Sequence, residues 1–192
     1  REQGYLPEAL LNFLMLLGYP PVREDDEVQT FAEFVEHFDW SKINPAGPIF
    51  DMDKLNWLNG YYIRALAPEA LADQIVAFMR QSGQLDPTPE QAAVITKATP
   101  LIQERLALLS EAQSKINFLL VADDQLELDE ASVAALPENA AEIVDAGAAA
   151  LQTCEPFTAD AIQAALRAEL VDGLGIKPKF AFAPLRVAIT GS

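Results

Sequence analysis

The fold class is decided by residues 51–66, DMDKLNWLNGYYIRAL. In this stretch Leu55, Leu58, Tyr62 and Leu66 recur every three or four positions, which is the spacing of one face of an α-helix. Asp51 stands directly before them, where a carboxylate accepts the first backbone N–H groups of a helix. The stretch therefore predicts a helix that begins at Asp51 and buries one face.

The same periodicity predicts helices along the rest of the chain. Alanine and leucine dominate the apolar residues, and both are strong helix formers. The sequence therefore predicts an all-α protein built of helical bundle subdomains. The first expected helix covers residues 7–17, and the second follows the acidic residues 24–27 and carries Phe31–Phe38. Further helices are expected at 68–79, 158–170 and 178–189. Two longer helical regions are expected at 90–122, with a kink or break at Pro100, and at 129–151, broken near Pro137.

Composition limits the class of protein. The 192 residues are 51% hydrophobic and 22% charged, which is too apolar for disorder despite a net charge of −16. A single cysteine, Cys154, and the lack of a signal sequence indicate a cytoplasmic protein. No apolar run reaches the ~20 residues of a membrane span. Because the chain begins at Arg1, we expect a fragment.

The distribution of charge bears on nucleic-acid binding. A strongly acidic chain argues against phosphate binding at first sight. However, the acidic bias is concentrated, because no lysine or arginine occurs between Lys115 and Arg167. The basic residues lie before and after that interval. The segment Lys54–Arg64, which mixes Trp57 and two tyrosines with basic ends, indicates a surface that stacks bases and meets phosphates. The alternative is a core helix in which Trp57 or Tyr62 packs against neighbours.

Residues for catalysis or metal binding are scarce. His37 is the only histidine and lies in an aromatic, apolar stripe, which favours a helix-surface or half-buried role over a catalytic one. One histidine and one distant cysteine do not make a metal site. The run Glu24–Glu27 lacks calcium-loop spacing and is expected to be a solvated helix start. Phosphate-binding glycine loops are also missing. We therefore predict no catalytic or metal site.

Three segments taken in order resemble bacterial glutamyl-tRNA synthetase downstream of its ATP-binding signature loop. They are residues 4–14 (GYLPEALLNFL) followed by Leu17–Tyr19, residues 50–64 (FDMDKLNWLNGYYIR), and residues 184–191 (PLRVAITG). The resemblance covers essentially the whole chain. The family's two ATP-phosphate motifs do not occur in this sequence.

The resemblance implies both a function and a division of the chain. Family members attach glutamate to tRNA-Glu with ATP and Mg²⁺, on a class I catalytic domain. The present chain would be the tRNA-recognition portion, inactive in aminoacylation by itself, without a cofactor of its own and monomeric. The resemblance also implies a stem-contact region at residues 1–66. It further implies an all-helical anticodon-binding cage, formed by one subdomain at 67–127 and a second, truncated one at 128–192.

The resemblance also supplies candidate tRNA contacts. Arg105 matches an arginine that reads the third anticodon base, and a guanidinium suits that task because it can donate two hydrogen bonds to a base edge. The alternative for Arg105 is a surface pairing with Glu104, Gln103 or a neighbouring helix. Arg186 could instead tie helices together. The full set of expected tRNA-binding residues is Arg105, Lys54, Trp57, Arg64, Lys115, Lys177, Lys179 and Arg186.

Two questions stay open from the sequence. The family continues beyond Gly191–Ser192 into a segment that helps bind the first anticodon base, so we expect weak, salt-sensitive tRNA binding. The sequence does not decide whether tRNA-Gln is also accepted. The rival hypothesis is an acidic helical scaffold that binds a protein partner through its alanine-rich half. Convergence of exposed basic residues on one surface would favour the RNA function.

Overall fold

The helix predicted from residues 51–66 is present in the computed structural model, which describes residues 2–24, 26–45 and 47–192. It is α3, Met52–Ala65, and the Asp51 carboxylate accepts the Lys54 N–H at 3.0 Å. Its buried residues include Leu55, Leu58 and Ile63. The carboxylate cap and the apolar period thus set the start and the inner face of α3, as expected.

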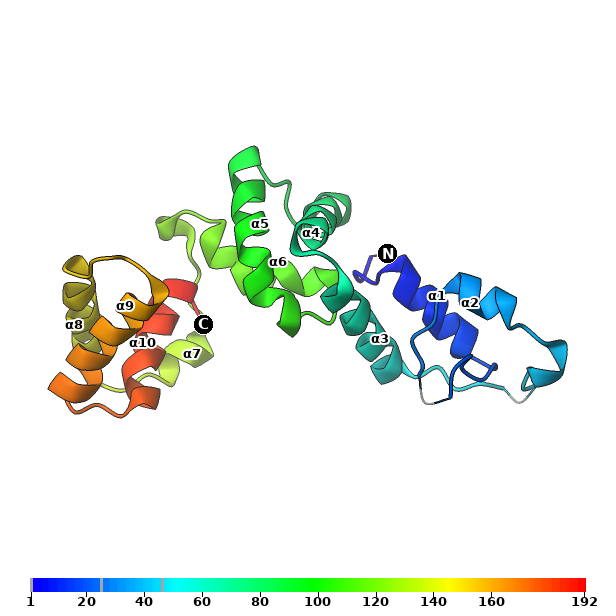
Figure 1. Ribbon diagram of the computed structural model, residues 1–192. Helices are drawn as coiled ribbons and strands as arrows, with labels where there is room; N and C mark the ends of the chain where they lie inside the picture. Colours follow the sequence, from blue (N-terminus) through cyan, green and yellow to red (C-terminus); the bar gives the residue numbers. More distant parts are fainter. Residues whose placement is uncertain (1, 25, 46) are drawn as a thin grey trace. The chain divides into compact units, whose positions relative to one another are not determined.

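The chain divides into two compact units, Arg1–Leu120 and Val121–Ser192. In the first unit α1, Pro7–Leu16, packs against α3 around Phe13, Leu55 and Leu58 (Figure 1). The short helix α2, Phe31–Glu36, lies beside α1. A 3₁₀ turn, Trp40–Lys42, follows it.

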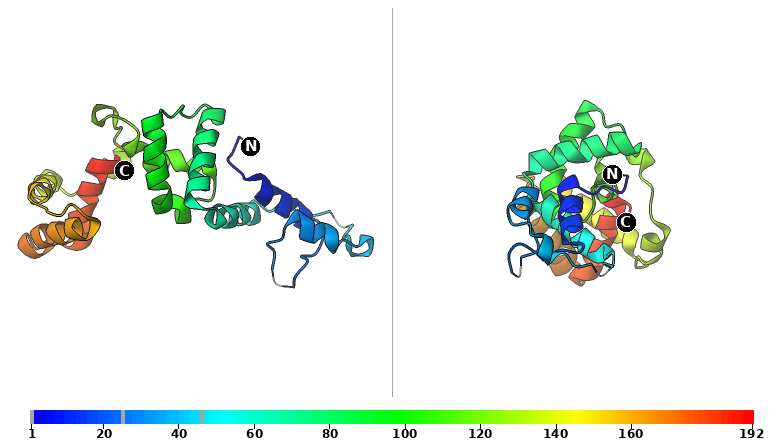
Figure 2. Two further views of the ribbon diagram at one scale, coloured as in Figure 1. Left: turned by 45° about the horizontal axis from the view of Figure 1, so that its top comes forward. Right: turned by 90° about the vertical axis from the view of Figure 1, so that its right-hand side faces the viewer.

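A larger core in the same unit forms around two paired helices. Helices α4, Pro68–Ser82, and α5, Pro89–Ile102, pack side by side in Figures 1 and 2. Short elements after α5 close this core: the 3₁₀ turns η2 (Gln103–Arg105), η3 (Leu109–Glu111) and η4 (Asn117–Leu119), and helix α6 (Ala112–Ile116). Fully buried residues include Leu71, Ile75, Met79, Ile95 and Ile116.

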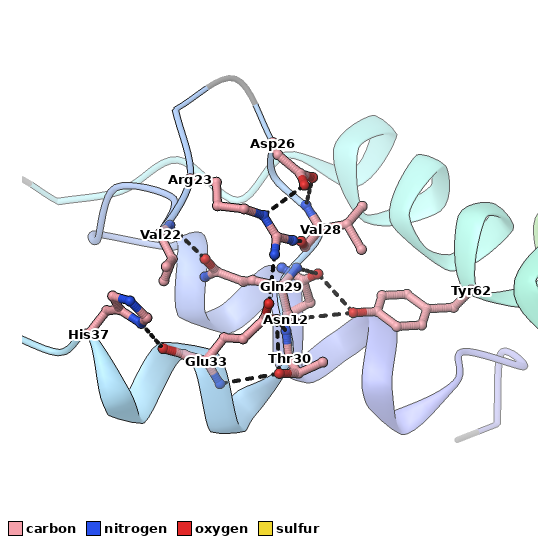
Figure 3. A network of polar contacts seen from close by, with 10 residues as sticks. All are labelled: Asn12, Val22, Arg23, Asp26, Val28, Gln29, Thr30, Glu33, His37 and Tyr62. Atoms are coloured by element: carbon pink, nitrogen blue, oxygen red, sulfur yellow. Dashed lines mark hydrogen bonds and ion pairs between the residues drawn. The ribbon is translucent and has the colours of Figure 1, made fainter.

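A polar network fixes the segment between α1 and α2 (Figure 3). The buried Asn12 amide donates to the Glu27 carbonyl at 2.9 Å and its oxygen accepts the Gln29 N–H at 3.0 Å. The Tyr62 hydroxyl of α3 donates to the same Asn12 oxygen at 3.0 Å. Burial raises the pKa of Tyr62, so the phenol stays a neutral donor. The network thereby joins α1, α3 and the connecting segment.

The second unit is a small helical bundle. A 3₁₀ turn, Asp123–Gln125, leads to α7 (Glu130–Ala134), α8 (Ala140–Gln152), α9 (Ala159–Leu166), a π-helical turn (Arg167–Gly173) and α10 (Pro178–Thr190). Ile143, Leu170, Ala181 and Leu185 form its core. The unit is closed by the Asp129 N–H, which donates to the Gly191 carbonyl at 2.7 Å.

The all-α fold class is confirmed, since the described residues contain helices and one isolated bridge between Arg23 and Asp26. The break near Pro137 and the Thr158 cap are also confirmed. The division into three functional regions at 66/67 and 127/128 stays a prediction.

Two expectations about helix limits are wrong. The second helix does not begin in the acidic run but at Phe31, where Thr30 and Glu33 form a capping box. The helix starting near Glu90 passes through Pro100 and ends at Ile102, and no long helix continues to residue 122. Leu106 and Leu108 have extended backbone angles instead, and the Leu109 N–H donates to the Gly4 carbonyl at 3.0 Å.

Candidate nucleic-acid interface

The face of α3 that points away from its buried residues carries a stripe of basic and aromatic side chains. Its members recur every three or four positions, so they lie along one side of the helix. We call it the α3 stripe, and it consists of Lys54, Trp57, Tyr61 and Arg64. Lys54, Trp57 and Arg64 were expected from the sequence. Tyr61 was missed, although its position four residues after Trp57 could have revealed it.

The two aromatic rings of the stripe face solvent. Trp57 is 49% exposed and Tyr61 is 42% exposed, with ring centroids 6.3 Å apart. The part of the alternative that makes Trp57 a core residue is therefore wrong, whereas Tyr62 does pack against the core of the first unit. Half-exposed aromatic rings beside cations are a surface on which RNA bases or riboses can pack.

Lys54, at the N-terminal end of the stripe, has a carboxylate partner. Its Nζ lies 2.6 Å from Glu27 Oε1, and both side chains are partly exposed. A partly exposed ion pair contributes little to stability, about 0–1 kcal/mol, and is screened by salt. A phosphate can therefore compete with Glu27 for Lys54.

Arg64, at the other end of the stripe, lies next to the turn that carries Arg105. A Cβ placed on Gly60 would lie 3.0 Å from Arg64 Nη1 and 3.5 Å from the Leu106 carbonyl oxygen. The absence of a side chain at Gly60 thus leaves room for both groups. Arg105 immediately precedes Leu106 and is the last residue of η2, so Arg64 and Arg105 stand on adjoining elements.

These two arginines also have no acidic partner. Among residues 2–24, 26–45 and 47–192 the ion pairs involve Arg23, Lys54 and Arg80, and neither Arg64 nor Arg105 takes part. The expected alternative of an Arg105 ion pair with Glu104 is not seen. Two exposed guanidinium groups without carboxylate partners are suited to phosphates or base edges.

The remaining candidates are not brought to this place. Lys115 is partly exposed on α6. Lys177 and Lys179, both exposed, begin α10 in the second unit. Arg186, also on α10, donates from Nη1 to the Ser192 carbonyl within that unit, so it holds the end of its own helix. The structure therefore assembles Lys54, Trp57, Arg64 and Arg105 in the first unit and leaves the others on separate elements.

The residues considered for catalysis and metal binding have ordinary surroundings. His37 is exposed at the end of α2, and its Nδ1 is 2.9 Å from the Glu33 carbonyl oxygen. In the acidic run, Asp26 pairs with Arg23 and Glu27 with Lys54, while Asp25 lies outside the described residues. Within the described part of the chain, no three histidine, cysteine or acidic residues gather as a metal site. The described helices are all too short or too polar to cross a membrane.

Comparison with known proteins bears on the part of the chain that follows the α3 stripe. Residues 69–192 match the family described as "Anticodon binding domain", and the chain belongs to that family. The match includes Arg105 and Lys115 and the whole second unit. An RNA-binding family is thereby favoured over the alternative of an acidic scaffold.

The relatives are glutamate–tRNA ligases. The chain is 53% identical over its full length to the glutamate–tRNA ligase of Cutibacterium acnes and 46% identical to that of Acidothermus cellulolyticus, covering 40% and 38% of these proteins. A crystal structure of a glutamate tRNA ligase from Elizabethkingia meningosepticum, in complex with its amino acid, superposes with a TM-score of 0.77 at 25% identity. That alignment covers 98% of this chain and 36% of the other.

Proposed function

We propose that this chain is the tRNA-recognition part of a glutamate–tRNA ligase and binds tRNA-Glu. The observation that carries the proposal is the position of two exposed arginines, Arg64 and Arg105, on adjoining elements at the end of the α3 stripe, neither of them ion-paired among the described residues. A chain with net charge −16 repels RNA on average, so binding requires such local basic sites.

Each candidate residue has a distinct task in this proposal. Arg105 reads the third anticodon base, because a planar guanidinium can address a base edge with two parallel hydrogen bonds. Lys54, Trp57 and Arg64 hold the tRNA backbone of the stem without reading sequence. Lys115, Lys177 and Lys179 meet phosphates near the anticodon loop, whereas Arg186 keeps the structural role of holding the end of α10. Residues 1–66 are then the stem-contact region, and 67–127 and 128–192 the two anticodon-binding subdomains.

The complete ligase would supply the chemistry from outside this chain. The chain spans about two fifths of the length of its relatives. In the proposal the remaining part binds ATP and Mg²⁺ and transfers glutamate to tRNA, in the cytoplasm and as a monomer. The present chain binds tRNA and does not aminoacylate it.

The proposal is tested by titrating the chain with tRNA-Glu and with the same tRNA changed at the third anticodon base, at low and moderate salt. We expect the native anticodon to bind about tenfold more tightly, since one good bidentate contact to a base is worth roughly 1–3 kcal/mol. Arg105→Ala should remove this preference. Arg80→Ala is the matched control, because Arg80 is exposed but paired with Asp86 at 3.0 Å.

Equal binding of both tRNAs by the unmodified chain would refute anticodon reading by Arg105. Equal binding of tRNA-Gln and tRNA-Glu would instead show that the chain accepts both. If no tRNA binds even at low salt, the recognition surface itself is refuted.

A further inference from the structure

We propose that Gln103 is a positioning residue for anticodon recognition, because it locks the turn that carries Arg105 onto the end of α3. This inference rests on the function proposed above and adds a residue to it. Gln103 is the first residue of η2, two positions before Arg105. It is a polar side chain that is only 8% exposed, so its burial requires hydrogen-bond partners.

The partners of Gln103 are the carbonyl groups that end α3. The last carbonyls of an α-helix have no partner within the helix. Gln103 Nε2 donates to the carbonyl oxygens of Leu66 at 2.9 Å and Ile63 at 3.0 Å, and lies 3.4 Å from that of Arg64. Because an amide has two N–H groups, the two short bonds use its full capacity and the Arg64 contact is shared. A single side chain thus caps the helix from another element.

This cap fixes the chain on one side of Arg105, and a second bond fixes it on the other. The Asn59 side-chain amide of α3 donates to the Ala107 carbonyl. The backbone from Gln103 to Ala107 is therefore attached to α3 at both ends, with Arg105 between the two attachments. The Leu106 carbonyl approaches α3 at Gly60, beside Arg64 Nη1. The position of Arg105 relative to Arg64 therefore depends on these bonds.

The chemistry of the cap also suits two neighbouring cations. The C-terminal end of a helix carries about half a negative charge. A lysine or arginine cap would add a full positive charge beside Arg64 and Arg105, whereas the amide of Gln103 satisfies the carbonyls without adding a net charge. Arg64 and Arg105 can then lie together near the end of α3 at a lower electrostatic cost.

The test uses Gln103→Met in the full chain, since methionine is similar in length and apolar volume but has no N–H donor. The affinity for tRNA-Glu is compared with that for the third-base variant of the same tRNA. We expect the preference for the native anticodon to fall from about tenfold to less than threefold. Circular dichroism and thermal unfolding should show that the fold is kept.

Two further variants separate positioning from general stability. Gln91→Met removes another tertiary amide bond, from Gln91 Nε2 to the Leu120 carbonyl at 2.7 Å, and should leave the anticodon preference unchanged. In the double variant Gln103→Met, Arg105→Ala the preference should be no lower than in Arg105→Ala alone, because Gln103 acts through Arg105.

The outcomes distinguish this inference from the function on which it rests. If the unmodified chain prefers the native anticodon, Arg105→Ala abolishes that preference and Gln103→Met retains it, the positioning role is refuted and the proposed function stands. Equal loss of preference in Gln91→Met and Gln103→Met would also refute the positioning role. If the unmodified chain has no preference, both proposals are refuted.

Discussion

At the scale of single residues, the four described arginines of the first unit differ in what surrounds them. Arg23 binds Asp26 at 2.9 Å and Glu33 at 2.6 Å, and Arg80 binds Asp86. Arg64 and Arg105 have no such partners among the described residues. An arginine already paired with carboxylates must give up those bonds to reach RNA. The surroundings therefore assign a structural task to Arg23 and Arg80 and leave the other two for a ligand.

The Arg23 and Glu33 pair gives a prediction about pH. The pKa of the Glu33 carboxyl is lowered from its ordinary 4.5, mainly because the carboxylate accepts the Thr30 backbone N–H at 2.8 Å, and also because the Thr30 hydroxyl and Arg23 donate to it. A lowered pKa in the folded state means that these bonds stabilise the fold fully above pH 4.5. Their contribution is lost as the pH falls through the lowered value.

The measurement is an NMR titration of the Glu33 side chain. In Thr30→Ala the hydroxyl donor is absent, so the pKa of Glu33 should rise toward 4.5, whereas Thr30→Ser should retain the low value. Melting curves between pH 2 and 6 should show a smaller loss of stability on acidification in the alanine variant. A Glu33 pKa that is the same in all three proteins would contradict this assignment.

At the scale of elements, the sequence predicts what local chemistry decides. Asp51 and the apolar period of residues 55–66 suffice for the start and the inner face of α3, and they place Lys54, Trp57 and Arg64 on the opposite side. The sequence predicts a kink or break at Pro100, and α5 ends two residues later, at Ile102. The path of the chain after that end could not be predicted, because the bonds that hold it are tertiary. Gln103 caps another helix and Leu109 binds Gly4, so neither partner is visible in the local pattern.

The same limit applies to the candidate site. Arg64 Nη1 and the Leu106 carbonyl, which follows Arg105, approach Gly60 of α3, and from the sequence alone that glycine indicates only a weakened helix. The ion pair of Lys54 with Glu27 also joins residues 27 positions apart. Arg105 stands out through the family resemblance, and its neighbours are set by tertiary contacts that the sequence pattern does not contain.

Gly60→Ala should separate stability from tRNA binding. Replacing a glycine within a helix by alanine stabilises by roughly 0.5–1 kcal/mol when the new Cβ is tolerated. Here that Cβ would lie 3.0 Å from Arg64 Nη1, the end of a flexible exposed side chain that can move. We expect an unchanged or higher melting temperature and a severalfold weaker affinity for tRNA-Glu, measured by the same titration.

The Arg64→Ala variant provides the control for this effect. If Gly60→Ala acts by displacing the Arg64 guanidinium, it should not weaken binding further in an Arg64→Ala background. An additive loss in the double variant would mean that the alanine methyl disturbs Leu106 or the backbone instead.

Gly147→Ala, in the second unit, should have the opposite effect on stability. The added Cβ would lie 2.7 Å from Leu185 Cδ2 and 3.5 Å from Leu166 Cδ2, in the buried contact between α8 and α10. Overpacking of this kind costs about 1–3 kcal/mol. Thermal or urea unfolding should show the loss, and Ala148→Gly, at the exposed neighbouring position of α8, should be milder. A Gly147→Ala variant as stable as the unmodified protein would mean that Leu185 repacks freely.

At the scale of the whole molecule, binding to tRNA joins two negatively charged partners. The net charge of −16 is spread unevenly, since the interval from Lys115 to Arg167 contains acidic but no basic residues between its ends. Favourable contacts must therefore come from a few exposed cations, each of which releases condensed counterions from the RNA. A small number of phosphate contacts makes the affinity low, and the release of counterions at those contacts makes it fall as the salt concentration rises.

This argument predicts the salt dependence of two matched variants. The first double variant, Lys177→Ala with Lys179→Ala, removes two exposed cations from the start of α10. The second, Lys42→Ala with Lys97→Ala, removes two exposed cations that are assigned no tRNA contact. Both double variants change the net charge equally. The slope of log affinity against log salt concentration should become shallower by about one to two in the first pair, since each lost phosphate contact removes roughly one unit. It should change little in the second. Equal changes would show that the overall field of the molecule, and not contact by Lys177 and Lys179, governs the affinity.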